Sequence, residues 1–405
     1  MNKPFLINFL SLNASSLYNR ILNFILFFFL IRFLTPAEYG IYTVAWAFVG
    51  ILAPFIDFGT TTYGLINLPG KEKNHMKEVI SFRFYLALLL FLVTILLAYV
   101  FNYSGAALTA ILLTSVTILA NMWSGTYLLV CSIRQKNYLP AIVSVIFNTV
   151  LITSLVILLF LRGSLIPLFV AISVSYSIYG IVNYVLTAQL TPISFSINIE
   201  AWRKIAASSV IFVFIAFFAG LYFKLDVLLL QSLKSAREVG VYSAGYKFFE
   251  AFIFIASTYN FVAAPVLSKL HSSNRNAFGY KVAVDSLMMF CIGVCGVIGV
   301  YVFGPVILPT VLKADFAASF FVLKIVILAL PLLFVTTVIL NAIYILKKSF
   351  WIIGLFGAMV AFNLIANYTL IPIYSYLASA WITVAAEMIN MIVTSIMVIY
   401  LLHKK

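Results

Sequence analysis

Charged residues are scarce in this sequence. Asp, Glu, Lys and Arg together make up 9% of its 405 residues, whereas 64% of the residues are hydrophobic. A soluble domain of average composition has about 25% charged residues, so this chain has too little polar surface to fold as a soluble globule. An apolar run of roughly 20 residues is long enough to cross a bilayer as a helix, and the sequence contains many of them. The composition therefore predicts an all-α polytopic membrane protein.

Cysteine, histidine and long polar connections are scarce as well. Three cysteines do not make a disulfide framework, and the three histidines fall in predicted connections, away from any buried site. No glycine-rich phosphate loop is present, and no connection looks longer than about fifteen residues, which leaves no room for a nucleotide-hydrolysing domain. Any catalysis would depend on carboxylates alone. We therefore expect a carrier without its own ATPase, not an enzyme, and neither a cofactor nor a metal site.

The apolar runs predict about twelve transmembrane helices. The first half contains spans at about 13–33, 41–66, 79–101, 106–130, 139–161 and 165–188. The second half contains spans at about 205–230, 239–267, 282–304, 320–345, 350–371 and 376–401. Internal prolines at Pro54, Pro265 and Pro331 predict kinks, since neighbouring helices can satisfy the freed carbonyls. The N-terminus lacks a short apolar core with a small-residue cleavage site, so the first helix should stay attached as a span.

The net charge of +14 arises mostly from Lys and Arg in the short connections. Sixteen of these residues, with Arg83 among them, fall in one set of connections, and five fall in the other, namely Arg32, Arg162, Lys234, Arg237 and Lys313. Positive residues are enriched on the cytoplasmic side of membrane proteins, so we expect both termini in the cytoplasm. The same distribution explains the charge without a nucleic-acid partner.

A short polar hinge between two apolar runs is repeated two hundred residues later. Glu38-Tyr39-Gly40-Ile41-Tyr42 aligns without a gap with Glu238-Val239-Gly240-Val241-Tyr242. A self-match at half the chain length indicates a duplication. Six predicted helices separate the copies, so we expect two six-helix lobes in the same orientation, related by a pseudo-twofold axis along the membrane normal. The N-terminal lobe covers 1–190, a cytoplasmic connection covers 191–203, and the C-terminal lobe covers 204–405.

Polar stripes along five of the predicted helices indicate a wet cavity between the lobes. Lipid-facing helices are apolar at helical spacing, so a polar stripe marks a face turned inward. We expect this cavity to bind substrate through the residues Arg20, Asn23, Asn121, Lys247, Glu250, Asn341 and Asn390. Arg20 could hold a phosphate or extend to the cytoplasmic interface. Lys247 could bind an anion or only form an internal ion pair with Glu250, which lies on the same helix face.

Three carboxylates in predicted spans are candidates for a coupling-ion site that would take Na⁺ or H⁺. Asp57 follows a proline kink that would free a carbonyl, although it could also be interfacial. Glu387 lies well inside the last helix and either binds an ion or pairs with a cation of another helix. Asp226 lies near the outer end of its helix, two residues from Lys224, so the two side chains point to different faces. Lys224 could simply extend to the interface.

Several of these residues form motifs of a known family. The run RFLTPAEYGIY from Arg32 to Tyr42 resembles the start of helix 2 in bacterial O-antigen and capsule repeat-unit flippases. The segment Asp57-Phe58-Gly59 resembles the end of that helix, and the passage from Asp226 to Lys247 is similar to the family's helices 7 and 8. The run from Asn363 to Pro372 is similar to its helix 11 and adds Asn363 to the predicted substrate-binding residues. Related proteins tend to have glycine and small residues in the next turn, where this sequence has Ile373-Tyr374-Ser375-Tyr376.

The resemblance implies the multidrug/oligosaccharidyl-lipid/polysaccharide exporter fold. Members of the family flip polyprenyl-diphosphate-linked oligosaccharides from the cytoplasmic to the periplasmic leaflet of the bacterial inner membrane by alternating access. It further implies the lipid bilayer and a downstream glycan polymerase as partners. The residue chemistry agrees, since a diphosphate needs cations such as Arg20 and Lys247. A multidrug or murein-precursor carrier of the same superfamily is the first alternative, and a membrane glycan ligase or polymerase is the second.

Overall fold

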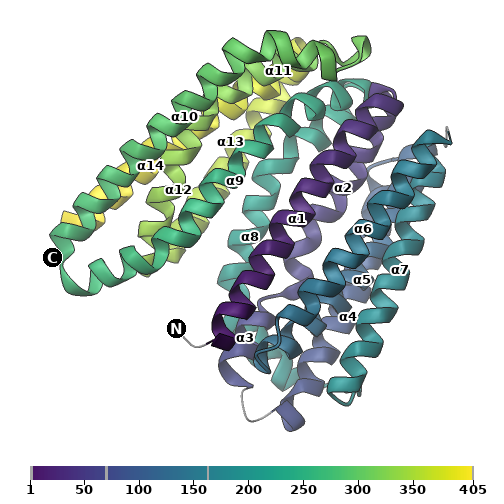
Figure 1. Ribbon diagram of the computed structural model, residues 1–405, viewed down its shortest axis with the longest axis vertical. Coiled ribbons are helices and arrows are strands. Elements are labelled where there is room, and N and C mark those ends of the chain that lie inside the picture. The colour runs from purple at the N-terminus through teal and green to yellow at the C-terminus, as the bar shows by residue number, and fades with distance from the viewer. Residues whose placement is uncertain (1–2, 69–71, 162–163, 404–405) are drawn as a thin grey trace. The chain divides into compact units, whose positions relative to one another are not determined.

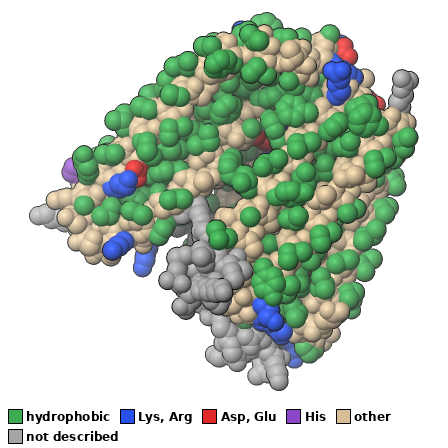
Figure 2. Space-filling view, viewed as in Figure 1, with side chains coloured by type: hydrophobic (Ala, Val, Ile, Leu, Met, Phe, Trp, Pro, Cys, Tyr) green, Lys and Arg blue, Asp and Glu red, His purple; other side chains and the backbone are tan. Residues whose placement is uncertain are grey.

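The fold is helical throughout the part of the chain that the computed structural model describes, residues 3–68, 72–161 and 164–403. Within these ranges twelve helical stretches are long and apolar enough to cross a membrane, which confirms the predicted fold class and the number of spans. Figure 1 shows them as long helices packed lengthwise. On the face shown in Figure 2, hydrophobic side chains cover most of the surface, and Lys and Arg lie near the helix ends. This distribution matches a surface immersed in hydrocarbon.

Contacts divide the chain into two compact units. Unit 1 comprises Met1–Leu34 and Val44–Gly220, and unit 2 comprises Thr35–Thr43 and Leu221–Lys405. The units therefore change over inside two continuous helices, α2 (Pro36–Asp57) and α8 (Ile199–Leu233). The lobes at 1–190 and 204–405 stay a prediction, because the division into units follows contacts and not the duplication.

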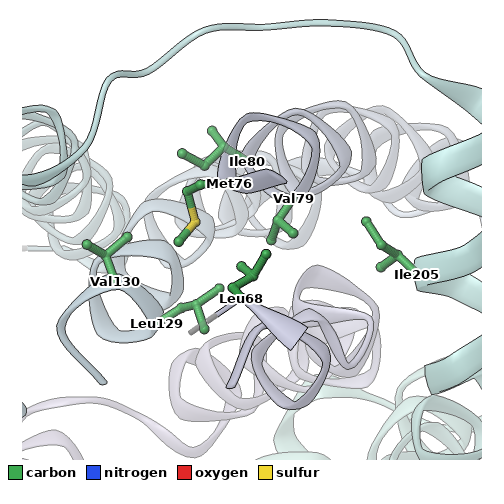
Figure 3. Close-up of a cluster of buried hydrophobic side chains, with 7 residues drawn as sticks. All are labelled: Leu68, Met76, Val79, Ile80, Leu129, Val130 and Ile205. Atoms are coloured by element: carbon green, nitrogen blue, oxygen red, sulfur yellow. The ribbon is translucent and has the colours of Figure 1, made fainter. Parts of the chain in front are cut away.

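Unit 1 is built around helices α5 and α7. Its helices are α1 (Lys3–Phe33), most of α2, α3 (Thr60–Asn67), α4 (Glu72–Val100), α5 (Gly105–Ile133), α6 (Tyr138–Phe160), α7 (Leu165–Leu190) and the first part of α8. A Cβ added to Gly180 of α7 would lie 3.0 Å from the Ala120 Cα of α5, so glycine is what permits this close packing. The α3, α4, α5 and α8 ends meet in a buried cluster of Leu68, Met76, Val79, Ile80, Leu129, Val130 and Ile205 (Figure 3). The cluster ties the start of α8 to unit 1.

The predicted span 41–66 is interrupted, and a kink at Pro54 does not describe it fully. Helix α2 ends at Asp57 and α3 begins at Thr60, with Phe58 at φ 43° and Gly59 at φ 68° between them. Right-handed helices cannot continue through positive φ. The Asp57 carboxylate accepts hydrogen bonds from the backbone N–H of Thr61 at 3.2 Å and from its hydroxyl at 2.6 Å. A membrane carboxylate thus caps a helix that restarts within the span.

Unit 2 contains the end of α8 and α9 (Ala236–Ser273), α10 (Arg275–Val311), η1 (Ala314–Phe316), α11 (Ser319–Val326), η2 (Ile327–Ala329), α12 (Leu330–Ile345), α13 (Ser349–Tyr374) and α14 (Tyr376–His403). The predicted span 320–345 is divided by the 3₁₀ turn η2 just before Pro331. Proline removes a backbone donor, and the tighter turn accommodates this. A Cβ on Gly293 of α10 would lie 2.5 Å from the Pro331 Cα, so α10 packs directly on the break.

The repeated hinge forms a reciprocal helix crossing inside unit 2. A Cβ added to Gly40 would lie 1.8 Å from the Ala236 carbonyl oxygen, and one added to Gly240 would lie 1.8 Å from the Pro36 carbonyl oxygen. Only glycine leaves room for these carbonyls. The two repeated glycines therefore let the first turns of α2 and α9 touch backbone to backbone.

Candidate functional site

Two lysines share one glutamate in the membrane-spanning part of unit 2. The Lys224 ammonium of α8 lies 2.9 Å from Glu250 Oε1, and the Lys247 ammonium of α9 lies 2.9 Å from Glu250 Oε2. The three side chains retain 35%, 36% and 27% exposure, in the order Lys224, Lys247 and Glu250. Extension of Lys224 to the interface, which the sequence allowed, does not account for this residue, because its ammonium pairs with Glu250. We call these three residues the lysine–glutamate cluster.

The charge of the lysine–glutamate cluster does not cancel. A single carboxylate with one oxygen for each ammonium leaves one unit of positive charge, and each ammonium has further N–H donors to offer. Cations inside a membrane span are costly and rare, and they usually line a substrate or ion path. A ligand with several anionic oxygens could bind between the two ammonium groups. The internal ion pair and the anion site, which the sequence left open, are therefore compatible here.

Two carboxylates of the same unit are buried without an ion-pair partner among the described residues, and each accepts a hydrogen bond from a tyrosine, whereas the buried Asp285 pairs with Lys281. The Tyr242 hydroxyl donates to Asp226 Oδ2, and the Val227 backbone N–H donates to Asp226 Oδ1 at 2.8 Å. The Tyr222 hydroxyl donates to Glu387 Oε1 at 2.8 Å. The exposed fractions of Asp226 and Glu387 are only 5% and 2%. A buried carboxylate without a cation beside it must be hydrogen-bonded, protonated or bound to a cation.

A polar chain continues from Asp226 across α14 to α13. The Tyr242 hydroxyl lies 3.4 Å from the hydroxyl of Thr383, whose own hydroxyl donates to the Ser379 carbonyl at 2.9 Å. The Ser379 hydroxyl donates to Asn367 Oδ1 at 2.8 Å, and the Asn367 amide donates to Asn363 Oδ1 at 2.5 Å. The predicted residue Asn363 is thus linked to Asp226 through residues of three helices, with the Ser379 backbone carbonyl as one step of the path.

Two other predicted residues of unit 2 keep unused polar atoms. Asn390 lies three residues after Glu387 on α14, and its Oδ1 has no partner among the described residues. Asn341 of α12 is 9% exposed, and the part of the chain described here offers its amide nitrogen no acceptor. Buried polar atoms without partners are uncommon and call for a ligand, an ion or water. These atoms could therefore form hydrogen bonds with a small polar ligand inside unit 2.

Unit 1 has a separate polar cluster around Arg83. This residue is 1% exposed in α4 and forms an ion pair with Asp57, and its Nε donates to the Thr60 hydroxyl at 2.5 Å. It also bonds the Thr61 hydroxyl at 2.8 Å. Counting Arg83 among the cations of a cytoplasmic connection was wrong, since it lies inside a span. The pairing speaks against Asp57 as a cation site, because the guanidinium already compensates its charge.

The remaining predicted residues also lie in unit 1. Arg20 and Asn23 are exposed on α1, where the Asn23 amide donates to the Asn19 carbonyl at 2.7 Å. Asn121 is half-buried on α5. Of the predicted substrate-binding residues, the structure joins Lys247 to Glu250 and links Asn363 to the Asp226 network. The roles of all these residues, and the cavity between the lobes, stay predictions.

Sequence reasoning missed most of the partners that hold the charged groups. Tyr222 and Tyr242 bind the two carboxylates, and Arg83 compensates a third. A tyrosine hydroxyl in an apolar run gives no periodic signal, since the ring itself is hydrophobic. Tyr242 could have been found, because it is a repeated residue of the duplicated hinge.

Comparison with known proteins gives a family and a fold. The family model described as polysaccharide biosynthesis protein matches residues 5–271. Among solved structures, the lipid II flippase MurJ in an inward closed conformation has a TM-score of 0.78 at 14% identity, over 95% of this chain and 87% of that chain. An inward-facing multidrug resistance MATE family transporter of the MOP superfamily has 0.73 at 13% identity, over 96% and 95%.

A MOP superfamily transporter from Pyrococcus furiosus also matches, with a TM-score of 0.61 at 13% identity, over 98% of this chain and 94% of that chain. No curated protein sequence matches the chain. At these identities the structural likeness establishes the fold and leaves the substrate to the residues of the site.

Proposed function

Because the chain belongs to the polysaccharide biosynthesis protein family, we propose that it is a flippase for polyprenyl-diphosphate-linked oligosaccharides. It moves the head group from the cytoplasmic to the periplasmic leaflet of the bacterial inner membrane by alternating access, with both termini in the cytoplasm. The observation that supports this substrate is the pair of ammonium groups on one carboxylate, Lys224 and Lys247 on Glu250. A diphosphate offers several charged oxygens to two cations that cannot both be neutralised by Glu250.

An ion gradient gives the transport its direction. Asp226 and Glu387 are the proposed coupling sites, because they are buried, carry a negative charge when ionised, and sit among hydroxyl and amide oxygens that suit Na⁺ or H⁺. Moving one charge across the membrane field is worth about 2.3 kcal/mol per 100 mV. A glycan polymerase that consumes the transported molecule on the outer side would also favour outward transport.

Two alternatives remain distinguishable by charge and chemistry. A multidrug or murein-precursor carrier shares this fold, and the murein precursor also carries a diphosphate, so only the glycan separates it from our proposal. A carrier of cationic drugs is disfavoured by the half-buried ammonium groups of Lys224 and Lys247. A membrane glycan ligase or polymerase would transfer sugar to an acceptor, whereas a flippase forms no bond.

The test is translocation of the lipid-linked intermediate by the purified protein in sealed vesicles. We expect movement across the bilayer without glycan transfer, and at least tenfold slower movement for Lys247→Ala and Lys224→Ala at equal protein level. Lys324→Ala is the matched control, because Lys324 of α11 lies over the Phe320 ring at 4.5 Å instead of in the cluster. Unchanged transport in Lys247→Ala would disprove the phosphate role. Bond formation by the purified protein would favour the ligase or polymerase.

A further inference from the structure

A polar cavity opens at the end of unit 2 opposite the C-terminus. It has a volume of about 580 Å³ and lies where α8 ends and α9 and α14 begin, next to η1. Figure 1 shows α11 at this end and the C-terminus at the other. Its lining includes Lys234, Ser235, Arg237, Glu238, Asp315 and Tyr376. The size falls in the range of small-molecule sites, about 300–1,000 Å³.

Groups of both charge signs face this cavity with bonding capacity to spare. Within residues 3–68, 72–161 and 164–403, the structure gives Arg237 and Asp315 neither a hydrogen bond nor an ion pair, and both are exposed. Lys234 donates to the Pro372 carbonyl at 2.9 Å and retains further N–H groups. Two cavities of unit 1 are instead lined almost entirely by apolar side chains. A ligand for the unit 2 cavity must therefore both donate and accept hydrogen bonds.

The first copy of the hinge differs from the second in how its glutamate is bonded. There, Glu38 closes a capping box, in which the Thr35 backbone N–H and hydroxyl donate to its carboxylate at 2.9 and 2.8 Å. In the second copy the carboxylate of Glu238 accepts instead from the Ser375 hydroxyl at 2.7 Å. The two cavity cations also lack counterparts, since Leu34 and Ala37 stand at the positions of Lys234 and Arg237. Among the described residues, the second copy therefore lacks the capping bond to its glutamate carboxylate, and it has polar side chains that line a cavity.

Ser375 holds this arrangement in a backbone conformation that favours glycine. Its φ is 53° and its ψ is −140°, in the turn between α13 and α14. A non-glycine residue in this conformation is strained, and such strain clusters at binding sites. A glycine would relieve the strain but would lose the hydroxyl that holds Glu238 in the cavity wall.

We propose that this cavity binds the saccharide portion of the transported molecule on the outer side of the membrane. The choice of a saccharide as ligand rests on the proposed function. Sugar hydroxyls donate to Asp315 and Glu238 and accept from Arg237 and Lys234, and Tyr376 offers a ring face for an apolar sugar face. The site holds the glycan after the lipid head group has crossed. It contains none of the residues of the lysine–glutamate cluster.

The experiment measures protection of a cysteine placed in the cavity wall. In a Cys291→Ser, Cys295→Ser background, Ser235→Cys is labelled with a maleimide in the full-length detergent-solubilised protein. The probe is a set of oligosaccharides prepared by partial acid hydrolysis of the host's own surface polysaccharide. We expect labelling to slow at least threefold at saturating probe. Thr35→Cys, at the equivalent position of the first copy, should show no slowing.

Four variants decide whether the cavity itself is responsible. Arg237→Ala and Asp315→Ala should abolish the protection, whereas Arg32→Ala, an exposed cation outside the cavity lining, should retain it. Ser375→Gly should weaken protection at least threefold without lowering the unfolding temperature, which separates the role of Glu238 from a folding defect. Labelling that the probe does not slow, or protection that survives Arg237→Ala together with Asp315→Ala, would overturn the proposal.

The same assay separates this proposal from the proposed function. The probe carries no lipid and no phosphate, so protection does not require transport. Vesicle transport in the absence of protection would remove the cavity site and leave the flippase intact. Protection by the probe in a protein that moves no lipid-linked substrate would leave the cavity as a saccharide site and remove the flippase.

Discussion

The two copies of the duplicated segment share helix ends and differ in their charges. Helices α1 and α8 end at Phe33 and Leu233, and helices α2 and α9 begin at Pro36 and Ala236, an offset of 200 in both cases. Lys224, Asp226, Lys247 and Glu250 occupy the positions of Phe24, Leu26, Ala47 and Gly50. Conversely, the position of Asp57 is taken by Ser257, whose hydroxyl bonds its own helix.

The difference separates scaffold from chemistry. The residues that let the helices cross, Gly40 and Gly240, are repeated, and their contacts are reciprocal. Apart from Glu38 and Glu238, the charges compared here are not repeated, although each is costly in a membrane. Charges that occur in only one copy are not needed for the backbone arrangement that both copies share. Their presence therefore favours a role in binding or coupling. Four predictions test this comparison, from the largest expected effect to the smallest.

The largest effect should follow Asp57→Ala, which leaves the Arg83 guanidinium buried without its carboxylate. Removing one partner of a fully buried ion pair costs about 3–5 kcal/mol, and because the Asp57 side chain is 43% exposed, we expect a loss at the lower end of this range. The free energy of unfolding in detergent should fall accordingly, and Arg83→Met added to Asp57→Ala should recover part of the loss. Ser257→Ala, at the equivalent position of the second copy, should change stability by less than about 0.5 kcal/mol. Equal losses for Asp57→Ala and Ser257→Ala would contradict the asymmetry.

Next come the two repeated glycines. Gly40→Ala and Gly240→Ala should each cost about 2–3 kcal/mol, because the new Cβ would overlap a carbonyl oxygen and the helices must move apart. The double variant should cost less than the sum, since both changes open the same crossing. Gly50→Ala has open space around it and should be neutral or stabilising by up to about 1 kcal/mol. Thermal unfolding of the four purified variants measures the series, and unequal losses at Gly40 and Gly240 would break the symmetry.

A smaller effect should follow Tyr242→Phe, which removes the hydroxyl bond to Asp226. Hydrogen bonds to charged groups contribute about 1.5–3 kcal/mol. Tyr246→Phe is the control in the same helix, because this buried tyrosine makes no hydrogen bond with any described residue. Gradient-driven transport in vesicles should fall for Tyr242→Phe and stay unchanged for Tyr246→Phe. If both variants behave alike, the Asp226 network has no part in coupling.

The smallest change is expected at the two glutamates of the repeat. Glu38→Ala should destabilise the protein by about 1 kcal/mol through the lost capping box. Glu238→Ala should cost less, because its carboxylate does not close the cap and its bond holds a strained serine. Unfolding midpoints of the two variants provide the comparison. A larger stability loss for Glu238→Ala would show that this residue has a structural role similar to that of Glu38.

Much of the fold could be predicted from the sequence, because spans depend on local hydropathy. The predicted span 376–401 lies within α14, Tyr376–His403, and the predicted span 139–161 coincides closely with α6. The sequence did not predict the local breaks in the helices or the partners of the charged side chains. The α2–α3 break depends on a positive φ at Phe58 and on the Asp57 cap, and neither follows from the proline alone.

The candidate site could be predicted only in part. Lys247 and Glu250 lie three residues apart on one helix, so their pairing follows from helical geometry. The second lysine, Lys224, comes from another helix. Its position near the end of a predicted span allowed it to extend to the interface, and its pairing with Glu250 could not be predicted from spacing along the chain. Arg83 was counted with the connections because it stands near a run of cations, whereas its burial depends on Thr60 and Asp57.

The sequence by itself determined the membrane class, the twelve spans and the duplicated hinge with its two glycines. These are properties of single helices, since hydrocarbon requires every backbone group to bond within its own helix. Only the tertiary structure decided which charges meet. Lys224 reaches Glu250, Tyr242 reaches Asp226 and Ser375 reaches Glu238 through contacts between helices, and side-chain energies in a low-dielectric interior depend on such partners.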